Sequence, residues 1–159
     1  MKEMPKRLGE ILLEKGLITE AQLYDALAEQ SLSNKFLGTI LVTKGWITEH
    51  QLMEALAEQF NMPLVELKKD QVNMELSNLL SSSLILDHKC FPIEQTPDTL
   101  TVAIVNPLDA VAISKIEQEA KPRKIKLVLV TEENLKEILL DYRRYISQSI
   151  QRLLRRDKK

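Results

Sequence analysis

The chain has 159 residues, enough for one ordinary domain or two small ones with a buried core. Its 44% hydrophobic and 28% charged residues are typical of a folded protein and exclude a disordered one. No apolar run approaches the roughly 20 residues that span a bilayer, and no signal-peptide core follows the charged N-terminus. The single cysteine excludes an internal disulfide, so we expect a cytoplasmic protein.

The net charge of −1 is unevenly distributed. Residues 143–159 contain seven basic residues and one acidic residue, a net charge of +6, so residues 1–142 carry −7. Such a tail can bind anionic lipid or nucleic acid, but it is also common on solvated helix ends and linkers. Because no aromatic residue follows Tyr145, we favour a linker, expect no DNA binding, and keep contact with a membrane surface as the alternative.

A 24-residue segment occurs twice near the N-terminus, at 7–30 and again at 36–59. At an offset of 29 residues, 16 of the 24 positions are identical. Two copies of one surface suit either pairing with each other or holding a ligand that is itself two-fold.

Each copy predicts two helices joined by a glycine turn. Leu8, Ile11 and Leu12 have helical spacing, and Gly16 follows where a left-handed C-cap residue belongs. Thr19 with Gln22 three residues later is the capping-box pattern of a second helix. The corresponding residues of the second copy are Leu37, Ile40, Leu41, Gly45, Thr48 and Gln51.

The first subdomain is expected to cover residues 1–62. A polar connector is predicted at 31–35 between the two helical hairpins, and Pro63 is expected to stop the fourth helix. The remaining divisions are a small subdomain at 64–145 and a basic helical tail or linker at 146–159.

After Pro63 the pattern changes to mixed helices and strands. The expected elements are a helix at 74–86, a strand at 90–94, a strand at 100–105, a helix at 109–120, a strand at 125–130 and a long helix capped by Thr131. The second and third strands are joined through a helix. The fold class is therefore α+β, with a four-helix repeat followed by a three-stranded subdomain and a long C-terminal helix.

Motifs for catalysis are missing from this sequence. It contains no GxxxxGK[ST], GxSxG or HExxH motif and no pair of CxxC motifs. The run His88-Lys89-Cys90 is more typical of a strand entry with a buried thiol than of a metal site. We expect a binding module with no metal, not an enzyme.

The doubled motif resembles the N-terminal MshEN domain of type II secretion and type IV pilus assembly ATPases. The two copies carry Arg-Leu-Gly or Phe-Leu-Gly at the start, then a leucine, a glycine, two further leucines and a final glutamine. Residues 64–145 also look like the α+β part of that family. Phe36 stands where the family often has arginine, and Asn106 where aspartate is frequent. The ATPase core that normally follows is absent, as in a fragment or a standalone form acting in trans.

The resemblance implies a regulatory module that binds cyclic di-GMP and requires no cofactor. It implies partnership with a secretion or pilus assembly ATPase or an inner-membrane platform protein, and a cytoplasmic location peripheral to the inner membrane. The residues that it assigns to the ligand are Arg7, Leu8, Gly9, Leu23, Leu27, Gln30, Phe36, Leu37, Gly38, Leu52, Leu56 and Gln59.

These residue types suit a guanine dinucleotide, although each has a structural alternative. Arg7 can meet guanine O6 and N7 bidentately, or a phosphate, whereas a lone arginine is usually a surface charge. Gly9 and Gly38 permit close approach of a ligand or of another helix. The leucines can face the purines, but helical spacing alone favours a core role. Gln30 and Gln59 can bond a base edge or remain solvated.

Phe36 has two opposite consequences. Replacing an arginine removes a charge-assisted contact of about 1.5–3 kcal/mol, whereas a phenyl ring stacked on guanine recovers about 1–3 kcal/mol.

The competing function is a docking module, which links a motor to its inner-membrane platform and uses the repeat only as architecture.

Overall fold

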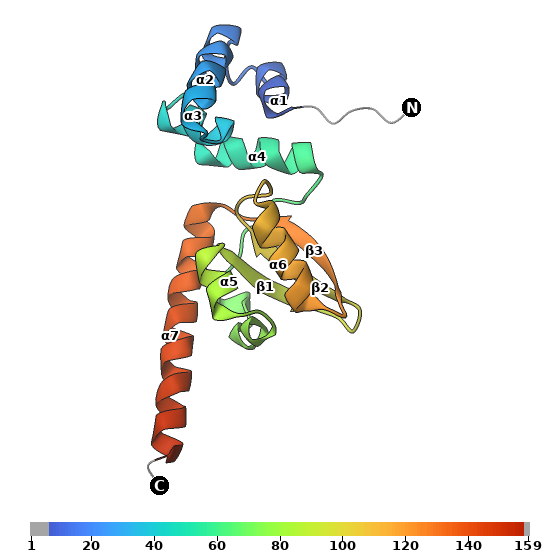
Figure 1. Ribbon diagram of the computed structural model, residues 1–159, viewed down its shortest axis with the longest axis vertical. Helices are drawn as coiled ribbons and strands as arrows, with labels where there is room; N and C mark the ends of the chain where they lie inside the picture. The colour runs from blue at the N-terminus through green and yellow to red at the C-terminus, as the bar shows by residue number, and fades with distance from the viewer. Residues whose placement is uncertain (1–6, 158–159) are drawn as a thin grey trace. The chain divides into compact units, whose positions relative to one another are not determined.

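The computed structural model describes residues 7–157 and divides into two compact units, one ending at Leu64 and the other beginning at Val65 (Figure 1). Each unit is described by itself. Among the described residues, no helix combines the length and apolar character needed to cross a membrane.

The first unit consists of four helices in two like hairpins. They are α1 (Leu8–Glu14), α2 (Glu20–Ser33), α3 (Leu37–Thr43) and α4 (Glu49–Phe60). The glycine turns are confirmed, because Gly16 and Gly45 have φ values of 69° and 76°. The N–H of Leu17 donates to the carbonyl of Leu12 at 3.0 Å, the bond that closes a Schellman turn.

Both predicted capping boxes are present. The backbone N–H of Gln22 donates to Thr19 Oγ1, and the Gln22 side chain accepts from the Thr19 N–H in return. Thr48 and Gln51 repeat this exchange at the start of α4.

The predicted connector at 31–35 is wrong, because α2 continues to Ser33. Ser31 and Ser33 donate their hydroxyls to carbonyls three and four residues earlier, so these polar side chains are satisfied inside the helix. The helix ends at Asn34, whose φ of 58° is left-handed, and α4 ends in the same way at Asn61.

The two hairpins pack against each other reciprocally. Helix α1 contacts α4, and α2 contacts α3. Lys15 pairs with Glu58 at 3.2 Å, and the equivalent residues exchange roles in the pair of Lys44 with Glu29 at 3.1 Å. Such exchange defines a pseudo-two-fold arrangement. The buried residues around it are Ile11, Leu12, Ile18, Ile40, Leu41 and Ile47.

The second unit places helices around a three-stranded sheet. Its elements are the 3-10 helices η1 (Lys69–Gln71) and η2 (Met74–Leu79), α5 (Ser82–Asp87), β1 (Cys90–Gln95), β2 (Thr99–Ile104), α6 (Ala110–Ala120), β3 (Lys124–Leu129) and α7 (Glu132–Asp157). The strand order is β1-β2-β3. Strand β1 is antiparallel to β2, and β2 is parallel to β3 with Val102 opposite Leu127, so α6 forms the crossover. The α+β fold is confirmed.

The predicted single helix at 74–86 is wrong. Leu80 is extended, with φ −127° and ψ 154°, and separates η2 from α5. Ser81 then starts α5 by accepting the N–H of Leu84 on its hydroxyl at 3.3 Å. A serine that caps a new helix therefore ends the helical pattern that the leucines suggest.

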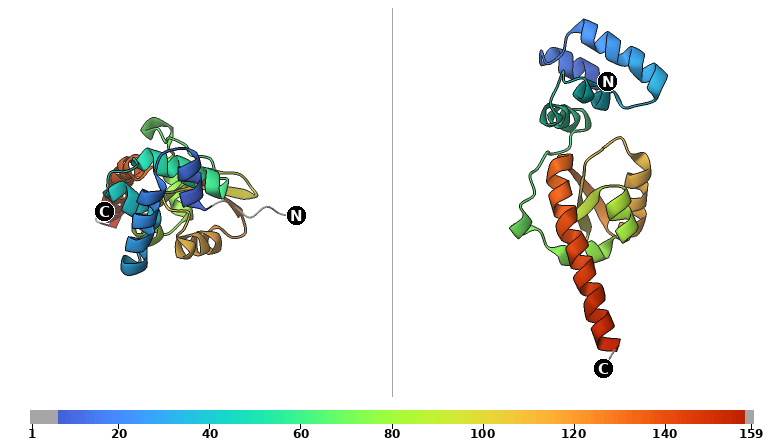
Figure 2. Two further views of the ribbon diagram at one scale, coloured as in Figure 1. Left: turned by 90° about the horizontal axis from the view of Figure 1, so that it is seen from above. Right: turned by 90° about the vertical axis from the view of Figure 1, so that its left-hand side faces the viewer.

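Helix α7 begins as expected and then runs on without a break. Thr131 Oγ1 accepts from the N–H of Asn134 at 3.1 Å. The segment 146–157 is helical and forms the second half of the same helix. Figures 1 and 2 both show this half extending past the sheet of its own unit.

The core of the second unit lies between the sheet and its helices. Phe91 is fully buried and meets the Tyr142 ring edge to face at 5.7 Å. Cys90 is also fully buried, and this burial raises the pKa of its thiol to about 12. The expectation of a strand entry with a buried thiol is confirmed.

Candidate ligand-binding site

The first positions of the two repeats are equivalent in backbone and different in chemistry. Arg7 (φ −74°, ψ 153°) precedes α1, and Phe36 (φ −67°, ψ 141°) precedes α3. The Arg7 side chain is exposed, and the Phe36 ring is 49% exposed. One copy thus presents a guanidinium where the other presents an aromatic ring.

Leucine side chains of the same repeat fill the space where a side chain of Gly9 or Gly38 would lie. A Cβ on Gly9 would lie 2.9 Å from Leu23 Cδ1, and a Cβ on Gly38 would come still closer to Leu52 Cδ1. Both distances are too short for real carbon atoms, so the helices approach this closely only because the side chains are absent. Close helix packing, one of the two alternatives for these glycines, accounts for them.

Leu23, Leu27 and Gln30 share one face of α2, because they are four and three residues apart. Leu52, Leu56 and Gln59 share the equivalent face of α4. Of the predicted ligand residues, the structure brings Gly9 together with Leu23 and Gly38 together with Leu52.

The two faces differ one helical turn further along. Leu27 is 46% exposed, whereas its equivalent Leu56 is only 6% exposed. The core role suggested by helical spacing holds for Leu56 and fails for Leu27. Gln30 and Gln59 are half-buried, and neither bonds to Arg7 or to another described side chain. Their amide groups remain available to a ligand.

A second polar cluster, which the sequence analysis did not identify, lies between α5 and α6. It borders a cleft of about 290 Å³ lined by Ser81, Ser83, Leu84, Asp87, His88, Lys115, Gln118 and Glu119. Glu119 accepts from both the N–H and the hydroxyl of Ser81, at 2.5 and 2.9 Å. These bonds tie α5 to α6, so the cluster has a structural role.

Asp109 completes this region at the start of α6. Its Oδ1 accepts from the Ala112 N–H at 3.0 Å, and its Oδ2 lies 3.3 Å from His88 Nδ1. The hydrogen bond from Ala112, followed by the contact with His88, holds the pKa of this carboxyl below its usual value. The signal in the sequence was Asp109 itself, because aspartate is a favoured N-cap residue whose carboxylate accepts from the N–H three residues later. Among residues 7–157, no group of three or more His, Cys, Asp or Glu side chains could hold a metal ion.

Comparison with known proteins connects this fold to one family. The MshEN domain profile matches residues 60–156, which is more than half of the chain. The type IV pilus assembly ATPase PilB of Thermus thermophilus is 30% identical over 114 residues, which cover 70% of this chain and 13% of PilB. The chain thus spans about an eighth of that relative's length.

Solved structures give the same result. The structure of MshE with cdg, cyclic di-GMP, is 30% identical, with a TM-score of 0.79 over 86% of this chain and 99% of that one. The N-terminal domain of XpsE, at 22% identity and a TM-score of 0.64, covers 86% of this chain and 95% of its own and shares the fold. The chain belongs to the MshEN domain family.

Proposed function

We propose that this chain is a regulatory module of a type II secretion or type IV pilus assembly system and binds cyclic di-GMP through its two repeats. The observation that carries the proposal is the pseudo-two-fold pairing of two copies of one motif, shown by the exchanged pairs Lys15–Glu58 and Lys44–Glu29. A ligand with two like halves matches such a surface. The likeness to MshE, whose structure was determined with cyclic di-GMP, supports the same ligand.

In this proposal the first copy contributes Arg7 to a guanine edge or a phosphate. The exposed Leu27 contacts a purine face, and Gln30 bonds a base edge or a ribose phosphate. Leu8 and Leu23 form the apolar support of this surface. The contact with Gly9 holds Leu23 against α1.

In the second copy Phe36 replaces the charged contact by stacking on the other guanine. A half-exposed ring at the position equivalent to Arg7 suits this role. Leu37, Gly38, Leu52 and Leu56 form the apolar support, and Gln59 is the counterpart of Gln30.

Isothermal titration calorimetry of the chain with cyclic di-GMP tests the proposal. We expect measurable heat for the unaltered chain and a loss of at least about 10-fold in affinity for Arg7→Ala, the scale of a hydrogen bond to a charged group. Arg152→Ala is the matched control, since it removes the same charge from the exposed second half of α7. No heat at high micromolar ligand, or equal loss in both variants, would contradict the proposal.

A second candidate function is protein docking, and one observation favours it. Tyr24 and Leu32 on α2 are 75% and 88% exposed, whereas Met53, the equivalent of Tyr24, is 3% exposed. An apolar face that is buried in one copy and open in the other suits a partner protein.

A pull-down with the purified motor ATPase or inner-membrane platform protein distinguishes the two functions. Docking alone predicts capture that is independent of cyclic di-GMP, lost in Leu32→Glu and unchanged in Arg7→Ala. Capture that requires the nucleotide supports the sensor instead.

A further inference from the structure

The second half of α7 exposes an apolar stripe. Ile150, Leu153 and Leu154 are 52%, 60% and 57% exposed, and their spacing of three and four places them on one side of the helix. Earlier in α7, Leu135, Ile138 and Tyr142 are buried against the body of the unit. The stripe therefore continues beyond the part of the helix that the core uses.

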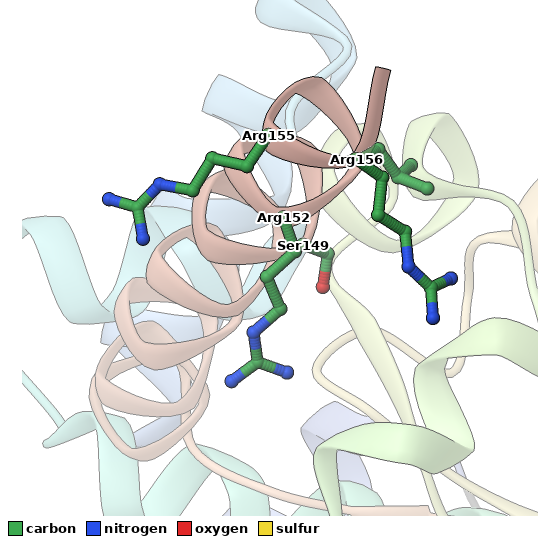
Figure 3. Close-up of a pocket in the computed structure, with 5 residues that line it drawn as sticks. Ser149, Arg152, Arg155 and Arg156 are labelled. Atoms are coloured by element: carbon green, nitrogen blue, oxygen red, sulfur yellow. The ribbon is translucent and has the colours of Figure 1, made fainter. Parts of the chain in front are cut away.

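Arginines accompany this stripe along the second half of α7. Figure 3 shows the guanidinium groups of Arg152, Arg155 and Arg156 fanning out from the helix. Together with Ser149 and Leu153, these arginines line an open hollow of about 620 Å³. The sequence contains no acidic residue between Asp141 and Asp157. Among the side chains that the structure describes, none of these three arginines forms an ion pair.

Helix stability explains only part of this pattern. Cations in the last turn interact favourably with the helix dipole, which accounts for Arg155 and Arg156. Arg152 and Arg156, however, are four residues apart, a spacing at which like charges repel. The dipole also gives no reason for three exposed aliphatic side chains beside them.

We propose that residues 143–156 bind an anionic membrane surface, with Ile150, Leu153 and Leu154 inserted at the level of the acyl chains. The arginines then contact lipid phosphates, which removes their mutual repulsion. An amphipathic helix with a basic polar face and aliphatic residues opposite is the form that lies in a lipid interface. The proposal uses no residue of the repeats, so it is independent of nucleotide binding.

Two other partners fit the stripe less well. Nucleic acid would use the arginines but give the exposed aliphatic residues no role. A second copy of the helix would bury the aliphatic residues but would bring two sets of unpaired arginines to the edges of one seam.

Co-sedimentation of the full chain with vesicles tests the proposal. We expect binding to phosphatidylcholine vesicles that contain phosphatidylglycerol, little binding to phosphatidylcholine alone, and weaker binding as salt increases. The triple variant R152Q/R155Q/R156Q should bind about 100-fold more weakly, following the usual contribution of each basic residue near an anionic surface. Ile150→Ser with Leu153→Ser should also reduce binding by at least about 10-fold.

The matched control is K68Q/K69Q/K121Q, which removes the same charge from exposed lysines of the same unit. It should bind like the unaltered chain. Equal loss in both triple variants, equal binding to neutral vesicles, or no vesicle binding would overturn the proposal. So would binding that an oligonucleotide displaces while the serine variant is unaffected, or a light-scattering dimer that the serine variant abolishes. Circular dichroism of each variant verifies that the helix is retained.

Discussion

At the scale of single residues, the four glycines of the chain divide into two kinds. Gly16 and Gly45 have positive φ and open space around them, so their backbone conformation explains them. Gly9 and Gly38 have ordinary backbones, and leucine contacts explain them. The sequence predicted the first kind from position alone. It left the second kind open, because ligand approach and helix approach both require a missing Cβ.

Gly38→Ala is expected to destabilise the chain more than Gly9→Ala. At Gly38 both Cδ atoms of Leu52 lie within 3.0 Å of the new Cβ, whereas at Gly9 only Leu23 Cδ1 does. A terminal methyl can turn aside, but displacement of the whole branch costs about 1–3 kcal/mol, against a helix-propensity gain of about 1 kcal/mol. Urea unfolding measures the difference.

The same substitution in a Leu52→Ala background is the control for this glycine. There the methyl has nothing to displace, so the penalty should disappear in the double-mutant cycle. Equal penalties at both glycines, or an unchanged penalty without Leu52, would show that another contact fixes this position.

Phe36→Arg is expected to tighten cyclic di-GMP binding, if the two repeats bind the ligand as proposed. The substitution gives the second copy the charged contact that Arg7 makes in the first, worth about 1.5–3 kcal/mol, and removes stacking worth at least about 1 kcal/mol, so the net gain is at most about 2 kcal/mol or roughly 30-fold in Kd. Phe36→Ala should weaken binding, because it removes the stacking contact and supplies nothing in its place. Calorimetry measures each Kd.

Val111→Ala, an exposed apolar side chain on α6, controls for the loss of surface area alone. If Phe36→Ala binds as tightly as the unaltered chain, the ring does not contact the nucleotide.

At the scale of elements, the sequence predicted those helices whose ends carry side-chain signals. The capping boxes, the glycine turns and the Thr131 cap all specify local hydrogen bonds, and all are present. The prediction failed where a signal had two meanings. Ser31 and Ser33 suggested a loop but bond back within α2. Ser81 lies inside the single helix predicted at 74–86 but starts a new one.

The stability of the chain should depend on pH through Asp109, at the start of α6. Its pKa is lowered from 3.8 in the folded chain, so the ionised carboxyl contributes stability that is fully present above that value. This contribution is lost as the pH falls below 3.8 towards the folded pKa. Asp109→Asn keeps a good N-cap but removes the charge.

The variant is therefore expected to be less stable at neutral pH, by less than about 1 kcal/mol, as for a partly exposed pair. The difference from the unaltered chain should shrink below about pH 4. Free energies of unfolding from pH 3 to 7 provide the measurement, and Asp98→Asn in the exposed β1–β2 turn is the control. A constant difference across this range would mean that the Asp109 charge makes no contribution.

At the scale of the whole molecule, the repeat predicted two like hairpins but not how alike their surfaces would be. The two hairpins have the same capping boxes and glycine turns, because these features depend on residues close together in the sequence. Exposure depends on what each hairpin contacts, and no periodic pattern distinguishes Leu27 from Leu56 or Tyr24 from Met53. The sequence therefore supplied the candidate residues of the site, whereas the asymmetry between its halves required the folded chain.

The division into two units leads to a final prediction about which helices and strands the ligand protects from amide hydrogen exchange. Cyclic di-GMP held by the repeats should slow amide hydrogen exchange in α1 to α4 and leave β1 to β3 unchanged, because the proposed ligand residues all lie before Leu64. At a ligand concentration of about 100 times Kd, binding stabilises the closed state by about 2.7 kcal/mol, so exchange that requires release of the ligand slows by about 100-fold. Exchange followed by mass spectrometry resolves the two units, and Arg7→Ala is the control, since it should lose the protection at the same ligand concentration. Protection of the sheet without protection of the helices would move the site out of the repeats.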